Sequence, residues 1–192
     1  MSQLELATEV RQGWVAARRA DPGATVQYFE RLLEDHPDSA TAMLHCARSH
    51  DFAGEPFLAA PLYGRAITAG LSGVPLRRCL ASYGSTLRNL ERFAESVRVL
   101  ESAHEQFPDD ALILCYLALA LHSAGEPAKA LSLLLDLALA KIEQHDLVAN
   151  RWALGNYAAA LTAGSWTPDG AASLELTGPL LEAGSADRTA AF

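Results

Sequence analysis

The sequence predicts an all-α protein built from stacked helix–turn–helix units. Two recurring turn signals support this fold class. The tetrapeptide Ala-Gly-Glu-Pro occurs at 53–56 and again at 124–127, and a Pro-Asp pair occurs at 37–38 and again at 108–109. The offset along the chain from first copy to second is identical for both signals. A shared offset between two different turn signals indicates copies of one unit, which must stack to bury their apolar faces.

A third observation divides this offset into two repeat lengths. Small residues recur in the first predicted helix of each unit at intervals of about 34 residues, the second interval being slightly longer, at Gly13, Ala47, Gly84 and Ala118. Each is followed by a break and then by an apolar stretch whose key residues are spaced by four and three. Because residues at these spacings share one face of a helix, each unit is predicted to be a pair of antiparallel helices.

The first unit is expected at about residues 6–39. Asp21 is suited to cap its second helix, and Pro22 has the fixed φ that suits the first turn of that helix. Thr25 and Phe29 then occupy the positions at which the later units carry a small residue and a large apolar residue.

The second unit, at 40–73, has Gly54 and Pro56 at its turn. Glycine suits the left-handed residue that ends a helix, and proline suits the first turn of the next one. The second helix of this unit follows, with its stripe at Ala59, Tyr63 and Ala66.

The third unit, at 77–110, has neither glycine nor proline at the corresponding turn. Asn89 is therefore expected to supply this turn, which makes it the weakest hinge of the array. The stripe of the second helix consists of Ser96, Leu100 and Ala103.

The fourth unit, at 111–145, has Gly125 and Pro127 at its turn. The stripe of its second helix consists of Ala130, Leu134 and Leu137.

A capping segment is expected at 146–183, because Leu154-Gly155 repeat the pair Leu117-Ala118 one unit later, as the first helix of a fifth unit would. Glycine and proline interrupt the rest of this segment, so only 171–176 is expected to add a short cap. Residues 1–183 are predicted to form one domain, and 184–192 a disordered tail.

In this register the sequence resembles the tetratricopeptide repeat family over roughly residues 6–145. It is most similar to group 5 of that family, a subgroup of single-domain bacterial proteins. The first unit departs from the family pattern at Glu9, Thr25 and Phe29. The resemblance implies a right-handed α-solenoid with a C-terminal capping helix, and a protein that binds other proteins and is not an enzyme. The best-matching copy begins at Ala111 and carries Leu114, Leu117, Ala118, Leu121, Gly125, Ala130 and Leu134.

The composition is that of a folded chain with an acidic balance. Of 192 residues, 50% are hydrophobic and 20% charged, and the net charge is −8. Residues 1–11 include Glu5 and Glu9 and lack the basic and then apolar order of a secretory signal. The longest apolar stretch, 111–121, is well short of the roughly 20 residues that a membrane span requires. We therefore expect a cytoplasmic protein without a membrane segment.

Residue patterns give no indication of a metal, cofactor or catalytic site. Cys46, Cys79 and Cys115 are spread one per unit, and an odd number cannot pair fully within one chain. Cys46 and His50 lie one helical turn apart, but two ligands are too few for a metal site, and apolar packing is the expected role of Cys46. Phosphate-binding, serine-hydrolase and metalloprotease motifs are absent from the sequence. We expect no enzyme activity and no cofactor.

The first helix of each unit is expected to line an inner groove, where a partner would bind. Arginine dominates the charge of this face, with Asp51 as its one acidic residue. Because the guanidinium group matches carboxylates bidentately, the groove is predicted to bind an acidic peptide or protein segment. The same arginines also suit a merely solvated helix face. The predicted groove residues are Arg11, Trp14, Arg18, His45, Arg48, Phe52, Arg78, Ser85, Arg88, Asn89, Tyr116, His122, Trp152 and Asn156.

Other partners are weighed by charge and by exposed leucine. Nucleic acid is disfavoured, because the net charge of −8 repels a polyanion. The leucine-rich second helix of the fourth unit, with Leu131 and Leu134, must be covered either by residues 146–181 or by a second chain, which leaves a homodimer open. The alternatives to a peptide-binding adaptor are therefore a structural oligomerisation module and a regulatory subunit of another protein.

Overall fold

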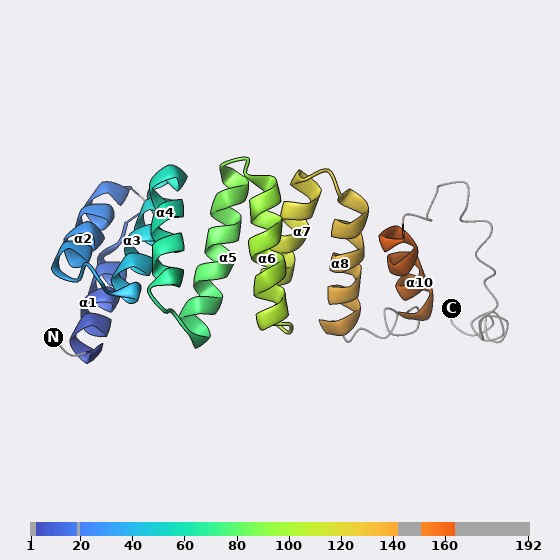
Figure 1. The fold of residues 1–192 in the computed structure, drawn as a ribbon, viewed down its shortest axis with the longest axis horizontal. Coiled ribbons are helices and arrows are strands. Elements are labelled where there is room, and N and C mark those ends of the chain that lie inside the picture. Colours follow the sequence, from blue (N-terminus) through green and yellow to red (C-terminus); the bar gives the residue numbers. More distant parts are fainter. Residues whose placement is uncertain (1–2, 19, 142–150, 164–192) are drawn as a thin grey trace, which may run out of the picture.

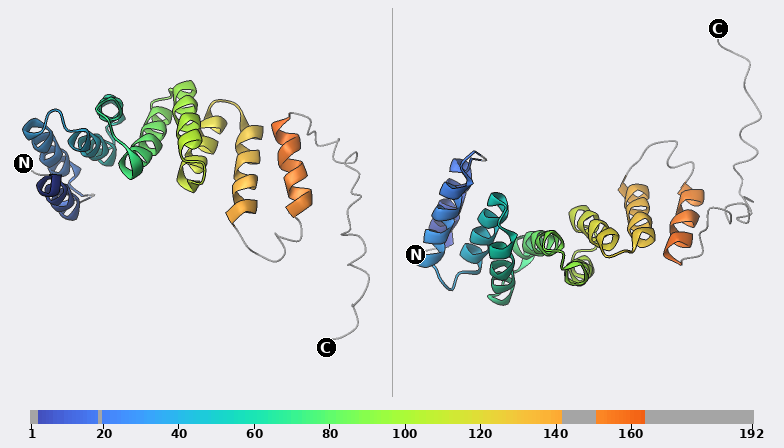
Figure 2. Two further views of the ribbon diagram at one scale, coloured as in Figure 1. Left: turned by 60° about the horizontal axis from the view of Figure 1, so that its bottom comes forward. Right: turned by 90° about the horizontal axis from the view of Figure 1, so that it is seen from above.

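The computed structural model describes residues 3–18, 20–141 and 151–163, and every regular element within these ranges is an α-helix. The helices follow one another as pairs along the long axis of the molecule, with α1 and α2 at one end and α10 at the other (Figures 1 and 2). Their bounds are α1 (Gln3–Ala16), α2 (Pro22–Asp35), α3 (Ala40–Ala53), α4 (Pro56–Thr68), α5 (Gly73–Asn89), α6 (Phe93–Gln106), α7 (Ala111–Ser123), α8 (Pro127–Lys141) and α10 (Arg151–Thr162).

This arrangement is a solenoid of helix pairs, as the sequence predicts. Helix α1 pairs with α2, α3 with α4, α5 with α6, and α7 with α8, and each second helix also packs against the first helix of the next pair. The first helices touch one another as well, α3 against α5 and α5 against α7. We call the side formed by α1, α3, α5 and α7 the first-helix face. None of the described helices is long and apolar enough to cross a membrane.

Two glycines mark the closest contacts between paired helices. A Cβ atom added to Gly13 would lie 2.6 Å from the ring of Tyr28, and one added to Gly84 would overlap the side chain of Leu100. Ala47, at the equivalent position of the second pair, is completely buried. The register of small residues deduced from the sequence is therefore the register in which the helices pack.

Helix ends follow the predicted turn chemistry in three of the four pairs. Gly54 and Gly125 adopt left-handed backbone angles, with φ of 79° and 84°. The carboxylate of Asp21 accepts a hydrogen bond from the backbone N–H of Ala24, so it caps α2 as expected. Pro56 and Pro127 open α4 and α8.

The prediction that Asn89 supplies the turn of the third pair is wrong. Helix α5 continues through Asn89, and the left-handed residue is Glu91, with φ of 59°. Glu91 lies one repeat after Gly54 and one repeat before Gly125, so it occupies the glycine position of the unit. The backbone keeps the geometry of the repeat there although the residue that favours this geometry is missing.

Replacing Glu91 with glycine is expected to stabilise the fold by about 1 kcal/mol. The left-handed conformation costs a residue with a side chain roughly 1 to 2 kcal/mol, and the greater freedom of glycine in the unfolded chain offsets part of the gain. Urea unfolding measures the change as a shift of the midpoint. The reverse substitution, Gly125→Ala, is the matched control and should lower stability by a similar amount. An unchanged midpoint for Glu91→Gly would contradict this account of the turn.

The C-terminal helix of the described part covers α8. Ser132 of α8 donates a hydrogen bond to the carbonyl of Ala158 at 2.7 Å, and Thr162 donates to Ser132 at 2.7 Å. Leu131 and Leu134 of α8 nevertheless stay 50% and 41% exposed. The cap predicted from 146 onward is thus described from Arg151 to 163, and the predicted short cap at 171–176 and tail at 184–192 lie outside the described residues.

Candidate protein-binding groove

The first-helix face is organised as a ladder of equivalent positions. The residues that directly follow Gly13, Ala47, Gly84 and Ala118 form one rung, which consists of Trp14, Arg48, Ser85 and Leu119 on α1, α3, α5 and α7. Contacts between these helices bring distant side chains together, as the hydrogen bond between Trp14 and His45 shows. The face is therefore assembled from residues that are far apart in the chain.

An aromatic cluster joins α1 to α3. The indole N–H of Trp14 donates a hydrogen bond to Nδ1 of His45 at 3.0 Å. The guanidinium carbon of Arg48 lies 4.9 Å from the centre of the Trp14 ring, a cation–π arrangement. Phe52 meets the same indole edge-on, with ring centres 6.1 Å apart, and Phe29 packs behind it at 4.8 Å. These contacts hold Arg48 in place before any ligand arrives.

His45 is neutral at physiological pH. Burial, and then the positive charges of Arg48 and Arg78, lower the pKa of its imidazole to about 4. Because Nδ1 accepts the hydrogen bond of Trp14, the single proton of the neutral ring is on Nε2. His45 therefore adds a hydrogen-bond donor, and no charge, between the two arginines.

Arg48 and Arg78 are positive charges without a carboxylate partner. Neither forms an ion pair within residues 3–18, 20–141 and 151–163. Arg78 is exposed and Arg48 is half-buried. The neighbouring Arg77 differs, because it pairs with Asp110 at the start of α7. The two unpaired arginines are thus available to an anionic group from outside.

The expected acidic residue of this face, Asp51, belongs to the interior contacts between pairs. The hydroxyls of Tyr63 and Thr86 both donate to Oδ2 of Asp51, each at 2.7 Å. Burial raises the pKa of this carboxyl above its usual value, an effect that the two hydrogen bonds only partly oppose. Asp51 therefore links α3, α4 and α5 through these hydrogen bonds, and it forms an ion pair with neither Arg48 nor Arg78.

Several other predicted groove residues have structural contacts. Arg18 donates to the carbonyls of Val15 and Ala17, at 3.0 and 2.9 Å, and so satisfies the end of α1. Arg88 donates through Nε to Ser123 at 2.9 Å, which joins α5 to α7. Tyr116 is half-buried against the apolar clusters below the face.

The remaining predicted residues differ in their exposure. Arg11, Asn89 and His122 are exposed, while Ser85 and Asn156 are half-buried. The side chain of Trp152 lies outside the described residues.

His50, weighed as a metal ligand with Cys46, has another role. Its Nδ1 lies 2.8 Å from a carboxylate oxygen of Glu55, and its Nε2 lies 3.7 Å from Glu30. It thus connects α2, α3 and the start of α4, while Cys46 is buried among apolar side chains. In the described part of the chain no group of three or more histidine, cysteine or acidic residues is placed to hold a metal ion.

Two surface depressions were not anticipated from the sequence. The first, of about 510 Å³, lies where the N-terminal ends of α3 and α5 meet α1, and it is lined by Leu6, Ala7, Ser39, Ala40, Thr41, Gly70, Leu71, Ser72 and Pro75. Neither its small nor its hydroxyl residues form a recognisable motif.

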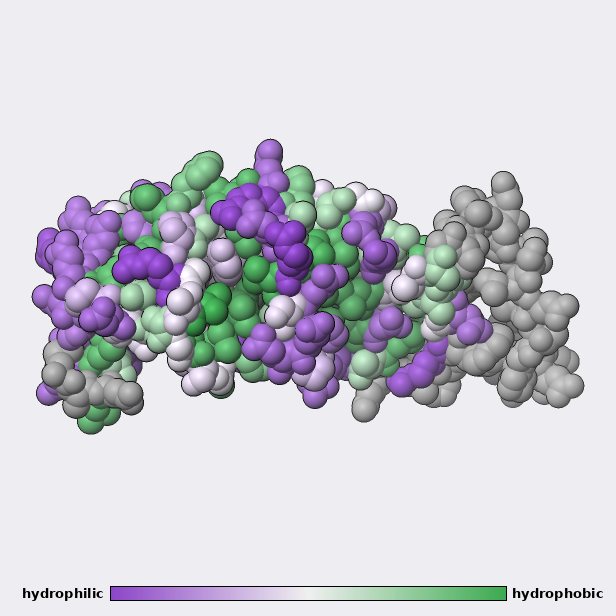
Figure 3. Space-filling view, in the orientation of Figure 1, coloured by the Kyte–Doolittle hydropathy of each residue, from purple (hydrophilic) through white to green (hydrophobic). Residues whose placement is uncertain are grey.

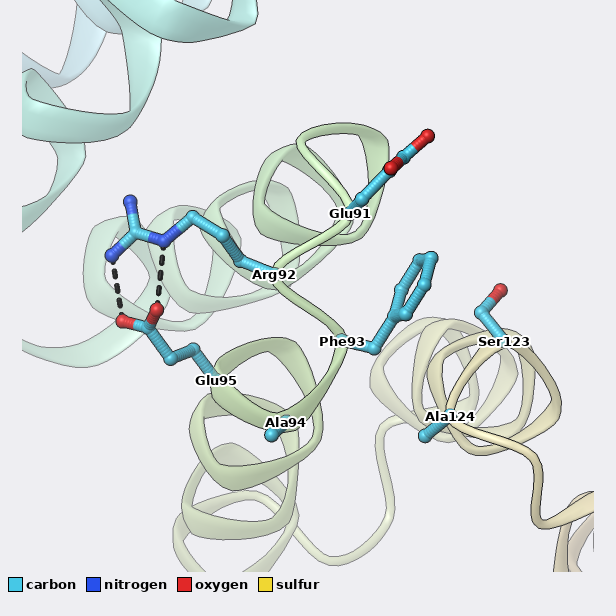
Figure 4. A pocket seen from close by; sticks show the side chains of 7 residues that line it. All are labelled: Glu91, Arg92, Phe93, Ala94, Glu95, Ser123 and Ala124. Atoms are coloured by element: carbon cyan, nitrogen blue, oxygen red, sulfur yellow. Dashed lines mark hydrogen bonds and ion pairs between the residues drawn. The ribbon is translucent and has the colours of Figure 1, made fainter.

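The second depression, of about 400 Å³, lies at the turn between α5 and α6, where Phe93 points toward the end of α7 (Figure 4). Arg92 and Glu95 at its edge neutralise one another in a bidentate pair at 2.8 and 2.6 Å. Arg92 thus has a carboxylate partner, and the other charged residue that lines this depression, Glu91, is acidic, so the depression offers no unpaired positive charge like those of Arg48 and Arg78.

The side of the molecule on which the second helices α4 and α6 lie is mixed in polarity. Figure 3 shows the side on which α4 and α6 lie in front, and polar and apolar side chains alternate over it. The unpaired charges of Arg48 and Arg78 make the first-helix face the better candidate for a binding surface.

Comparison with known proteins agrees with the repeat architecture. A family model described as "Tetratrico peptide repeat", the group 5 form, matches residues 40–161, and a second, described as "Tetratricopeptide repeat", matches residues 8–39. No curated protein sequence matches the chain significantly.

Solved structures with the same fold share little sequence. A structure titled "Functional Characterization of Pseudomonas Aeruginosa pilF" superimposes with a TM-score of 0.61 at 20% identity, over 84% of this chain and 77% of that one. A MamA double mutant, from RS-1, has a TM-score of 0.61 at 15% identity over 85% and 93% of the two chains. MamA 41-end from Desulfovibrio magneticus RS-1 has the same TM-score and identity over 91% and 99%. At these identities the likeness concerns the fold alone.

Proposed function

The chain belongs to the tetratricopeptide repeat family, and on that premise we propose that it is a non-enzymatic adaptor that binds an acidic segment of another protein along the first-helix face. Repeats of this family act generally as protein-interaction scaffolds, and the acidic character of the partner is the further step. One observation carries this step. Arg48 and Arg78 flank a neutral histidine donor and have no carboxylate partner among the described residues.

The affinity would come from several weak contacts that are organised in advance. An exposed ion pair contributes only about 0 to 1 kcal/mol, so one arginine alone would not hold a partner. The contact with Trp14 fixes Arg48, and the hydrogen bond of Trp14 fixes His45. Because these side chains are already ordered, binding costs less conformational entropy than it would on a flexible surface.

The test is charge reversal on the two faces. The double variant Arg48→Glu/Arg78→Glu is expected to lose the proteins that the wild-type chain captures from its native cell extract, because two attractive contacts become repulsive. The control Arg31→Glu/Arg98→Glu alters the net charge equally, at exposed positions of the second helices α2 and α6, and should capture the same proteins as wild type.

For the wild type and both double variants, the captured proteins are identified by mass spectrometry at low and at high salt. Exposed charges are screened over about 8 Å at physiological ionic strength, so capture through them should weaken as salt rises. If Arg48→Glu/Arg78→Glu still captured the same partners while retaining its helical circular dichroism, the proposed function would be abandoned.

The exposed leucines of α8 favour a second candidate function, a homo-oligomerisation module. Leu131 and Leu134 remain half-exposed although α10 packs beside them. Light scattering over a range of concentrations decides between the two, because an oligomer held by these leucines would be dissolved by Leu131→Ser/Leu134→Ser. For the adaptor we expect the mass of a monomer.

A cytoplasmic location is part of the same proposal, and the three unpaired cysteines favour a reducing compartment.

A further inference from the structure

The residue types at equivalent positions of the first-helix face differ between α3, α5 and α7. One rung runs from Arg48 through Ser85 to Leu119, and the neighbouring rung runs from His45 through Ser82 to Tyr116. The surface therefore passes from basic, at Arg48 on α3 and Arg78 near the start of α5, to small and polar further along α5, and then to apolar on α7. A partner that lies across these helices meets three different environments in a fixed order.

The apolar end is exposed although its residues are large. Leu112 and Leu119 are 53% and 45% exposed, and their spacing of two helical turns places them on the same side of α7. Tyr116, between them in sequence, is half-buried. Exposed leucines beside an interaction surface gain free energy when a partner covers them.

The middle of the face presents a small polar side chain. Ser85 has a small side chain, and its hydroxyl forms no hydrogen bond within the described part of the chain. Such a hydroxyl suits the carbonyl or N–H of an extended segment. This set of equivalent positions thus offers a charged contact at Arg48, a polar contact at Ser85 and an apolar contact at Leu119.

We propose that this face recognises a two-part segment, in which an acidic side chain binds between Arg48 and Arg78 and a bulky apolar side chain covers Leu112 and Leu119. The inference rests on the proposed function and specifies its partner. Packed helices lie about 8 to 10 Å apart, so the distance to α7 from the midpoint between α3 and α5, where the acidic side chain binds, is roughly 12 to 15 Å. An extended chain advances about 3.3 Å per residue, so the two anchor residues are separated by about four residues.

The experiment uses fluorescent synthetic peptides of one design. Each begins with Asp-Asp, continues with a Gly/Ser spacer of one to nine residues, and ends with Leu-Phe; a matched peptide ends with Ser-Ser. Fluorescence anisotropy with the full chain at low salt measures the dissociation constants. The tightest binding is expected near a spacing of about four residues, about tenfold tighter than for the Ser-Ser peptide, as burial of one large apolar side chain implies.

Single substitutions separate the two anchor points. Leu119→Ser should abolish the tenfold advantage of the Leu-Phe peptides and leave binding of the Ser-Ser peptide unchanged. Arg78→Glu should weaken binding of both peptides. The control Leu131→Ser, at a similarly exposed leucine of α8, should alter neither. Circular dichroism confirms that each variant is folded.

The remaining outcomes distinguish failure of the two-part segment from failure of the acidic adaptor. If acidic peptides bind with the same affinity whatever their spacer or apolar end, the two-part segment is wrong and the acidic adaptor stands. If no acidic peptide binds, or binding ignores Arg78→Glu, the adaptor proposal falls with it. If light scattering shows a dimer that Leu119→Ser dissolves, the apolar end belongs to a second copy of the chain and the inference is overturned.

Discussion

Asp51→Ala is expected to destabilise the protein by about 2 kcal/mol. Asp51 accepts hydrogen bonds from Tyr63 and Thr86, and both of those residues are 1% exposed. Removal of the carboxylate leaves the phenolic hydroxyl of Tyr63 without its acceptor in the interior, and an unsatisfied buried donor costs roughly 1 to 3 kcal/mol. Thr86 is affected less, because its hydroxyl also reaches the carbonyl of Ser82 at 2.9 Å. Urea unfolding at pH 7 measures the loss.

Asp51→Asn is the matched control, because its amide oxygen still accepts from Tyr63 while the charge is gone. Burial raises the pKa of Asp51 in the folded protein above its unfolded value. The folded state therefore binds more protons than the unfolded state in the range between those two values, and this group makes stability fall as pH rises through that range. At pH 7 Asp51→Asn should be at least as stable as wild type. Equal losses for alanine and asparagine would contradict the role assigned to the hydrogen bonds.

Gly84→Ala is expected to destabilise the protein by about 1 to 2 kcal/mol, although this change normally stabilises a helix. The added Cβ would overlap Leu100, which is completely buried and has no room to move away. Overpacking of this kind costs roughly 1 to 3 kcal/mol, which exceeds the gain of about 1 kcal/mol in helix propensity. The shift of the thermal or urea midpoint measures the result.

Gly64→Ala is the control for the expected loss of stability in Gly84→Ala. Gly64, inside α4, has only the hydroxyl of Tyr83 nearby, at 3.8 Å from the position of an added Cβ. Gly64→Ala should therefore stabilise the protein by about 0.5 to 1 kcal/mol. If Gly84→Ala and Gly64→Ala changed stability in the same direction, the small residues would not mark the contacts between paired helices.

The repeat register was predictable because it is marked by positions at which the fold requires a left-handed backbone or a very small side chain. Gly54 and Gly125 mark left-handed turns, and Gly13 and Gly84 mark close helix contacts. Glu91 was missed because its residue type carries no turn signal. Its left-handed backbone follows from its place in the repeat, and a register argument applied to that position would have found it.

The contacts of the candidate groove residues were harder to predict than the fold, because a side chain on a predicted helix face has several partners within reach. Asp51 was expected on the groove face, but its carboxylate accepts hydrogen bonds from Tyr63 and Thr86. Arg18 was counted as a groove charge, but it folds back onto the carbonyls at the end of α1. Sequence spacing gives the helix face, whereas these hydrogen bonds depend on three-dimensional neighbours.

The central statement is that α1, α3, α5 and α7 together form one surface for an acidic segment. Amide chemical-shift mapping of the isotope-labelled chain with a synthetic decapeptide of alternating Glu and Gly tests it most directly. We predict shifts concentrated on α3 and α5 around His45, Arg48 and Arg78, extending to α1 and α7 and weakening as salt is added. Shifts concentrated on α2, α4 and α6, or none at millimolar peptide in low salt, would contradict it.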